Sequence, residues 1–302
     1  MQAASTVVDS QRVTQALEAF ALSNTDDASD ALCTQLGSLG VELQNRAFTK
    51  NRGAESAKTQ KHWRSFARSC EYMTRRLGDL LTRLVMVRWI HGQRVASGES
   101  PGGWRAQFAK FLIKDFHADA SSFMDSLAPV VAQVPRALPP ATLRTPPGFS
   151  DVVAYSNSKR KDGLREGVPA EILRIVDSTD RWWPLVKCVR QFLHHREHVV
   201  IPFGHPEEGF LFQVYSDRHE PLITDAVLLW PQGSFVADFG PYSAFVVAEA
   251  VALLDDLGVA ASQAFGVELE EHMLIMGGDY ADVVSSLRAL ARRADEVSGE
   301  RT

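Results

Sequence analysis

The chain has 302 residues, of which 45% are hydrophobic and 23% are charged. This composition is typical of a globular protein with one large domain or two small ones. The formal net charge is −5, which excludes a global basic field for nucleic-acid binding. Any such binding would have to use a local basic patch.

The cysteines give an expectation about the cell compartment. Cys33, Cys70 and Cys188 lie far apart and lack the C-x-x-C spacing of zinc sites. They are typical of reduced thiols, so we expect a cytoplasmic protein. The sequence does not open with a basic segment followed by an apolar run, and no apolar run reaches about 18 residues. We therefore expect neither a signal peptide nor a membrane span.

The first part of the chain has the hydrophobic pattern of helices. Residues 8–48 carry two predicted helices, and Asp26 and Asp27 are suited to begin the second one. A polar segment, residues 49–58, precedes a long helix predicted at about 59–91. The apolar stripe of this long helix comprises Phe66, Cys70, Met73, Leu77, Leu80, Leu81 and Leu84. Its opposite side carries the basic residues Lys61, Arg64, Arg68 and Arg75.

A turn is predicted at Gly98–Gly103, followed by helices at about 104–116 and 120–134. These elements complete an N-terminal helical region, residues 1–134. Residues 135–169 contain six prolines, and this composition predicts a loop or linker.

The C-terminal helical region, residues 170–302, is predicted to begin with one helix over about 170–199. Runs of strand composition then predict a three-stranded antiparallel β meander near 209–239. Pro241 suits the first turn of another long helix, and a last helix is predicted at about 279–296. The predicted fold class is therefore mainly α, a helical bundle with a small inserted antiparallel β meander.

Three of the nine histidines lie within ten residues, in the segment VRQFLHHREH at Val189–His198. On a helix, Val189 and Phe192 fall on a buried stripe, whereas Arg190 lies on a polar side. The histidines that can project beside Arg190 are His194, His198 and, at the edge of the stripe, His195.

This arrangement suits metal-free cleavage of RNA. A fixed guanidinium stabilises negative charge on a phosphate oxygen. A neighbouring imidazole takes up or gives a proton near neutral pH. The ribose 2′-hydroxyl would attack its own phosphate, so we expect no cofactor and no metal ion.

The segment resembles the HEPN superfamily of helical-bundle proteins. The mark of this family is an arginine, a polar residue, a few positions and then a histidine near the end of a long helix. Arg190, Gln191 and His195 match this mark, with Gln191 where asparagine is more usual. Pro202 matches the proline that closes the exit of such helices. The resemblance is centred on residues 170–265.

The resemblance implies a function and partners. Many HEPN proteins are metal-independent ribonucleases of toxin–antitoxin, antiviral-defence or RNA-processing systems, and their cleft commonly forms between two protomers. The implied partners are thus RNA and a second copy of the chain. Arg190, Gln191 and His195 would be catalytic, assisted by His194 or His198. A basic segment could contact the phosphate backbone through Lys159, Arg160, Lys161 and Arg165.

Other interpretations of the same segment stay open. It could belong to a non-catalytic interaction module, antitoxin-like or regulatory, with a protein partner. It could equally be a solvated helix end, where cations favour the negative end of the helix dipole. A zinc site would use His194, His198 and His205.

Several nearby residues are interpreted without a function. Cys188 and Trp182 fall on the apolar stripe and are predicted to pack in the core. Trp182 and Trp183 could stack on nucleic-acid bases, but Pro184 beside them suits a first helical turn. The acidic residues of the long helix after Pro241, namely Glu249, Asp255 and Asp256, are predicted to be solvated.

Overall fold

The computed structural model describes most of the chain. The described residues are 8–19, 31–32, 34–49, 57–100, 102–135, 148–153, 165–195, 210–215, 219–230, 235–269, 274–275 and 281–299. The α-helices in these ranges are α1 (Ser10–Ala19), α2 (Gln35–Thr49), α3 (Ala57–Ser97), α4 (Trp104–Gln133), α6 (Ala170–Asp177), α7 (Trp183–His195), α8 (Phe239–Phe265) and α9 (Ala281–Gly299). The shorter elements are the 3₁₀ helices η2 (Phe149–Asp151) and η3 (Ser178–Arg181) and the strands β1 (Ala31–Leu32), β2 (Leu211–Phe212), β3 (Ala237–Asp238) and β4 (Leu274–Ile275).

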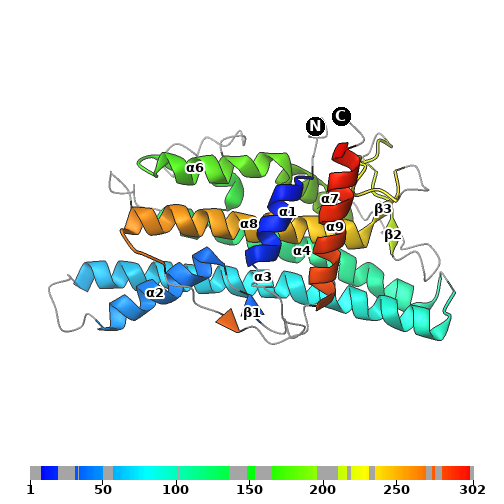
Figure 1. Cartoon of the computed structure of the whole chain (residues 1–302), viewed down its shortest axis with the longest axis horizontal. Coiled ribbons are helices and arrows are strands. Elements are labelled where there is room, and N and C mark those ends of the chain that lie inside the picture. Colours follow the sequence, from blue (N-terminus) through cyan, green and yellow to red (C-terminus); the bar gives the residue numbers. More distant parts are fainter. Residues whose placement is uncertain are drawn as a thin grey trace.

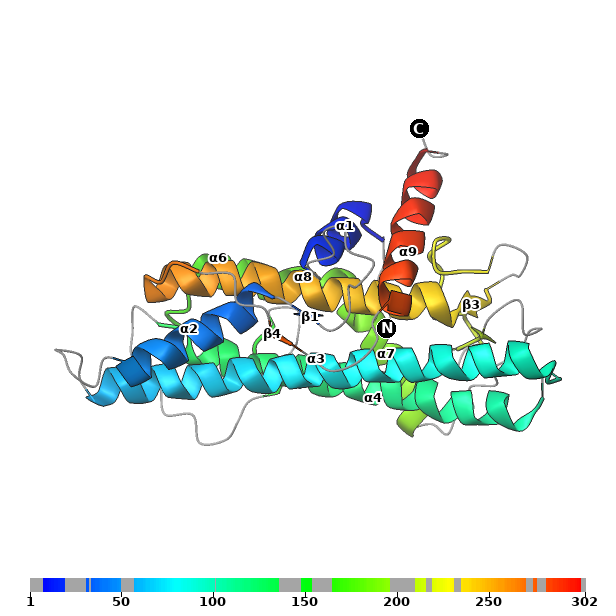
Figure 2. The same cartoon turned by 60° about the horizontal axis from the view of Figure 1, so that its bottom comes forward.

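The helices are arranged around a long hairpin. Helices α3 and α4 lie side by side and are joined by the predicted turn at residues 98–103, and α8 runs along them (Figure 1). Helix α2 packs between α3 and α8, whereas α6 packs on α8 and α7 on α4. Helices α1 and α9 cross α8 on its outer side (Figure 2). The mainly α prediction is confirmed.

One hydrophobic core includes residues from both sides of the predicted linker, for example Phe116 and Phe245. Every residue of the apolar stripe predicted for α3 is buried in it, because a period of 3.6 residues places them on one face. Lys61, Arg68 and Arg75 lie exposed on the other side, as predicted. Most of the linker itself lies outside the described residues.

Helix α4 is one continuous helix, so the prediction of two helices at 104–116 and 120–134 was wrong. Residues across the predicted break stay on the buried face, among them Phe116, Ala120 and Phe123. The Ser122 hydroxyl donates to the Ala118 carbonyl at 3.0 Å, so this serine is accommodated within the helix. Packing against α3 and α7 therefore maintains the helix through a segment of weak propensity.

The helix predicted at about 170–199 is interrupted, which corrects the sequence prediction. Helix α6 ends at Asp177, η3 follows, and α7 begins at Trp183. Pro184 has no backbone N–H to extend a preceding helix, but it suits a first turn. Trp182 and Trp183 are buried beside this break, as predicted for Trp182. The prediction beyond His195 lies outside the described residues.

The small antiparallel β region is confirmed, but its order differs from a simple meander. Strand β2 pairs with β3, with Leu211 opposite Asp238 and Phe212 opposite Ala237. Leu229 forms an isolated bridge to Ala237, so β3 lies between the other two segments. The predicted strand that contains Leu229, the second of the three in chain order, is thus reduced to a single bridge. A second pair, β1 with β4, was not predicted.

The remaining helix boundaries have local causes. Asp238 caps α8 by accepting a hydrogen bond from the Gly240 N–H at 2.9 Å, and Pro241 lies in the first turn as predicted. Gly266 ends α8 with a φ of 63°, a conformation that favours glycine. Asp26 and Asp27, proposed as the start of the second helix, lie outside the described residues. None of the described helices combines the length and apolar composition that a bilayer crossing requires.

Candidate functional site

Helix α7 presents the predicted motif as the sequence pattern suggests. Val189 and Phe192 are buried against the rest of the bundle. Arg190 is partly buried and Gln191 is exposed, so the polar residues lie off the apolar face. The side of α7 that carries Arg190, Gln191 and His194 is called the α7 polar edge below.

Arg190 differs from the other partly buried arginines near it. Its Nε is buried and has no hydrogen-bond partner within the described part of the chain. The Nε of Arg181 is likewise buried without a partner, but Arg181 pairs with Glu249 through another nitrogen and Arg165 pairs with Asp177. Arg190 forms no ion pair within the described residues. A buried N–H without a partner is costly, so the Arg190 guanidinium is suited to accept an anion.

His194 is held by helix α4. Its Nε2 lies 2.9 Å from the Lys114 carbonyl oxygen. A carbonyl only accepts hydrogen bonds, so Nε2 carries the hydrogen. In the neutral ring the lone pair is then on Nδ1, where a proton can be accepted. One histidine of the α7 polar edge therefore has a defined orientation and tautomer.

His117, which the sequence did not single out, lies beneath this edge on α4. It is fully buried, with Nδ1 donating to the Ile113 carbonyl at 2.7 Å and Nε2 at 3.0 Å from the Tyr242 hydroxyl. Burial, with a smaller contribution from the nearby His194, lowers the pKa of His117 to about 4, although the hydrogen bond to Ile113 acts in the opposite direction. At neutral pH His117 is uncharged and serves as a hydrogen-bonded part of the core.

The other predicted catalytic residues are placed only in part. His195 is the last residue of α7, but its side chain, like all of His198, lies outside the described residues. The structure therefore brings Arg190, Gln191 and His194 to one helix end and says nothing of the imidazole of His195.

Of the predicted RNA-contacting residues, Lys159, Arg160 and Lys161 lie outside the described residues. Arg165 donates to both carboxylate oxygens of Asp177, at 2.8 and 2.6 Å, and to the Val152 carbonyl at 2.7 Å. Its charge is thus compensated within the fold, and it ties residues 152 and 177 together.

Within the described ranges, no group of three or more histidine, cysteine, aspartate or glutamate side chains could hold a metal ion. His198 and His205, two of the proposed zinc ligands, lie outside those ranges. Cys188 is partly buried, and burial raises the pKa of its thiol, as expected for a packing residue.

An exposed aromatic face lies close to the α7 polar edge. Trp104, Phe108 and Phe111 follow one side of α4 at helical spacing, and Trp104 and Phe111 are 63% and 57% exposed. Trp89, on the neighbouring α3, is 61% exposed. Phe111 precedes Lys114, the partner of His194, by one helical turn. Several exposed aromatic residues on neighbouring helices are typical of interaction surfaces, and these four are called the aromatic face below.

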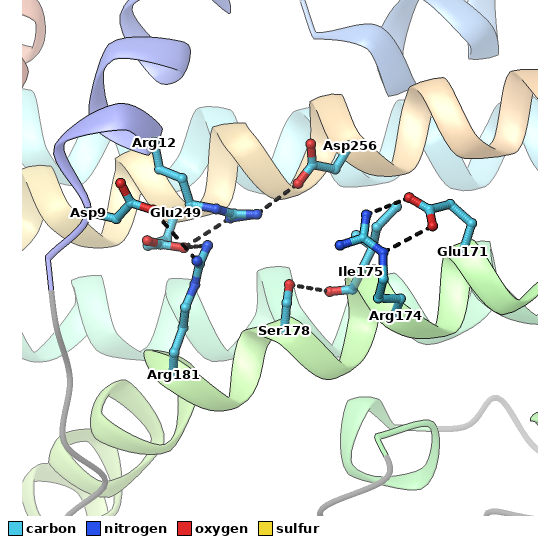
Figure 3. Close-up of polar contacts among 9 residues, drawn as sticks. All are labelled: Asp9, Arg12, Glu171, Arg174, Ile175, Ser178, Arg181, Glu249 and Asp256. Atoms are coloured by element: carbon cyan, nitrogen blue, oxygen red, sulfur yellow. Dashed lines mark hydrogen bonds and ion pairs between the residues drawn. The ribbon is translucent and has the colours of Figure 1, made fainter.

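A buried ion cluster lies near the other end of α7 (Figure 3). Glu249 of α8 is only 2% exposed and accepts hydrogen bonds from Arg12 at 3.2 Å and Arg181 at 3.1 Å. Arg12 also pairs with Asp256 at 2.7 Å. Burial raises the pKa of Glu249, whereas the two arginines lower it. The prediction of a solvated Glu249 was wrong, because arginines far away in sequence allow its burial.

Asp255 was also predicted to be solvated, but it is partly buried. Its Oδ1 accepts a hydrogen bond from the Gln35 N–H at 2.8 Å, at the start of α2. Burial, with a smaller contribution from Asp256, raises the pKa of Asp255 to about 7, although the hydrogen bond from Gln35 acts in the opposite direction. Asp256 is 43% exposed at its side chain, so only this member of the three is largely solvated.

Comparison with known proteins leaves the candidate site to be judged on its own geometry. No protein-family model, curated protein or solved structure matches this chain.

Proposed function

We propose that the α7 polar edge is the active site of a metal-independent endoribonuclease of the HEPN type. The observation that carries the proposal is Arg190, a partly buried arginine that forms no ion pair within the described residues and whose buried Nε has no hydrogen-bond partner there. A phosphate would supply the missing acceptor and the compensating charge. The oriented imidazole of His194, one turn along the helix, supports the same assignment.

The proposed reaction is an internal transesterification of RNA. The 2′-oxygen forms a bond to phosphorus as a base takes its proton, and the bond from phosphorus to the 5′-oxygen breaks as that oxygen gains a proton. The products end in a 2′,3′-cyclic phosphate and a 5′-hydroxyl. Arg190 would stabilise the charge on the phosphoryl oxygens, His195 would transfer protons, and Gln191 would hold the phosphate by hydrogen bonds.

In the proposed enzyme, the aromatic face would form the interface of a homodimer. This face and the α7 polar edge both adjoin the same part of α4, around Phe111 and Lys114. A second copy that covered the aromatic face would enclose RNA beside Arg190 and exclude water from the cleft. Burial of tryptophan and phenylalanine side chains would supply much of the association energy.

The test is cleavage of a labelled RNA in excess EDTA. Wild-type protein should cleave RNA but leave DNA of the same sequence intact, because DNA lacks the nucleophilic hydroxyl. Arg190→Ala should lower the rate by about 10²–10³, the loss expected for one charge stabiliser. Lys187→Ala is the matched control, since Lys187 is an exposed cation of the same helix. Activity that required a divalent metal, or an equal loss in both variants, would refute the proposal.

A second candidate, a non-catalytic interaction module, is favoured by the aromatic face and by the bond that ties His194 to the Lys114 carbonyl. Light scattering distinguishes the two when combined with the RNA assay. Phe111→Ser should dissociate a homodimer, whereas Tyr72→Ser, at another exposed aromatic of α3, should not. A folded dimer that cleaves no RNA would favour the module.

A further inference from the structure

A pocket of about 340 Å³ opens where α3, the start of α8, α9 and the β region meet. Its volume lies near the lower end of the range for small-molecule sites, about 300–1,000 Å³. Most of its wall is apolar and includes Leu84, Val87, Phe210 and Phe239, all of which are buried. No described residue of α7 lines it, so the pocket is separate from the α7 polar edge.

The two charged side chains that line the pocket interact with each other. Arg88 comes from α3, and Asp238 is the N-cap of α8. A Cβ atom at Gly240 would lie 3.2 Å from the Arg88 guanidinium and 3.3 Å from the Asp238 carboxylate, so both charged groups lie beside the same turn. Burial raises the pKa of Asp238, whereas the Gly240 hydrogen bond and the charges of Arg88 and Arg293 lower it. Within the described part of the chain, the lining therefore holds one cation and one anion that already attract each other.

These interactions determine which ligand charge the pocket accepts. Arg88 also donates to the Ser286 hydroxyl and has further interactions within the fold. The Asp238 carboxylate accepts a hydrogen bond from the Gly240 N–H at 2.9 Å. An ionised ligand would lose its hydration on entry without gaining a free counter-charge, which is costly. A neutral ligand avoids this cost.

The lining also includes an uncharged polar ring. His91 follows Arg88 by one turn of α3, and its ring contacts that of Phe210, with the two centroids 5.5 Å apart. Burial lowers the pKa of His91, and Arg94 and Arg88 lower it too, so the ring is neutral at pH 7. Its Nδ1 is buried and has no hydrogen-bond partner within the described residues, so the imidazole retains hydrogen-bonding capacity. A ligand hydroxyl can donate or accept, and it can therefore pair with a neutral imidazole in either tautomer.

We propose that this pocket binds a small, uncharged aromatic molecule that carries one hydroxyl group. The aromatic body would lie against Phe210, Trp230 and Phe239, since aromatic pairs contribute more than their buried area alone. The hydroxyl would exchange a hydrogen bond with His91. Apolar cavities in proteins bind neutral aromatic molecules such as benzene in this way. The proposal goes beyond RNA cleavage and does not depend on it.

Isothermal titration calorimetry on the full chain at pH 7 tests the charge preference. The probes are 2-naphthol, which is neutral at this pH, and naphthalene-2-carboxylate, which has the same rings and one negative charge. Wild-type protein should bind 2-naphthol at least about tenfold more tightly, because the carboxylate would lose hydration without gaining a free counter-charge. No binding of 2-naphthol, or binding of the carboxylate as tight as that of 2-naphthol, would overturn the proposal.

A substitution at His91 tests the role of the hydroxyl. His91→Leu removes both ring nitrogens, so it should weaken 2-naphthol binding by about two- to tenfold, the loss expected for one neutral hydrogen bond. Naphthalene, which lacks the hydroxyl, is the matched probe and should bind wild type and variant alike. Equal weakening of both probes would mean that His91 acts through packing alone, and would overturn its role in the site.

A filling variant tests the position of the site without changing its polar groups. Ala289 is exposed on α9 and lines the pocket, so Ala289→Phe should block 2-naphthol and leave the fold intact. Ala57→Phe, the same substitution at an exposed position at the other end of α3, is the control and should bind like wild type. Thermal unfolding should be alike in the two variants. Unchanged binding by Ala289→Phe would place the probe elsewhere and refute the site.

Discussion

The arginines at the two ends of α7 differ in their ion pairing. Arg181, just before the helix, donates to the buried Glu249 at 3.1 Å and lies 3.9 Å from Asp9. Arg190, near the other end, forms no ion pair in the described part of the chain, and its buried Nε, like that of Arg181, has no hydrogen-bond partner there. The first end is a structural joint with compensated charges. At the second end, the positive charge of Arg190 has no counter-charge within the described residues. An anionic ligand bound there would supply one.

This comparison separates stability from function. A buried ion cluster is costly to form, but losing one member leaves a buried charge without compensation. Substitution at the Arg181 end should therefore lower the free energy of unfolding. Substitution of Arg190 should leave the fold largely intact and reduce ligand binding or catalysis. If substitution of Arg190 lowered stability and substitution at the Arg181 end did not, the two ends would not have the roles assigned to them.

The largest expected effect on stability is at Glu249. Glu249→Gln keeps the shape of the side chain but leaves Arg12 and Arg181 facing each other, so we expect a loss of about 3–5 kcal/mol in the free energy of unfolding. Urea denaturation measures this loss. A triple variant with apolar residues at all three positions should recover much of it, because no buried charge is then left alone. A single variant as stable as wild type would contradict the comparison.

The next effect concerns catalysis at the opposite end of α7. Arg190→Ala should raise the barrier for RNA cleavage by about 3–4 kcal/mol, equivalent to the rate loss given above. Its urea midpoint should stay close to that of Lys187→Ala. The single-turnover rate and the unfolding curve are measured on the same preparation. A large loss of stability in Arg190→Ala would instead make Arg190 a structural residue like Arg181.

A third effect is the pH dependence at His117, which supports the α7 polar edge from below. Its pKa is about 4 in the folded chain and 6.5 as an ordinary value. Unfolding therefore takes up a proton between these pH values, and the His117 contribution to stability is lost as pH falls from 6.5 to 4. The loss should reach about 3 kcal/mol, at 1.36 kcal/mol for each pH unit. It should be absent in His117→Gln.

The measurement is the difference in unfolding free energy between wild type and His117→Gln across this range. A difference is needed because the pKa of Asp255 is raised to about 7. The stability contribution of Asp255 is greatest at low pH and declines as pH rises, which is the opposite slope. A difference curve without slope between pH 4 and 6.5 would mean that His117 is not buried in its neutral form.

The smallest effect is expected on the outer side of α6. Glu171 and Arg174 form a 2.5 Å ion pair (Figure 3), but their side chains are 51% and 70% exposed. Water screens such a pair, so Glu171→Gln should leave the urea midpoint unchanged within error. This variant is the exposed counterpart of Glu249→Gln. A loss comparable to that of Glu249→Gln would show that burial is not what distinguishes the two glutamates.

Local pattern in the sequence determined the mainly α class, the buried stripe of α3 and the buried face of α7. These features depend on residues three or four positions apart, whose relation is set by the geometry of a single helix. The start of α8 could be anticipated for the same reason, since Pro241 acts on its own turn. Within the candidate site, sequence predicted that Arg190 would lie off the buried face of α7.

Tertiary structure alone decided which polar groups are buried and which partners they have. Glu249 meets Arg12 across 237 positions of sequence, and His194 meets the Lys114 carbonyl across 80. The continuity of α4, the break before α7 and the pocket beside Arg88 likewise depend on how separate helices pack. The physical reason is that helix periodicity shows which face of a helix is apolar, whereas the burial of a charge depends on a partner that only the packed chain brings within hydrogen-bond distance.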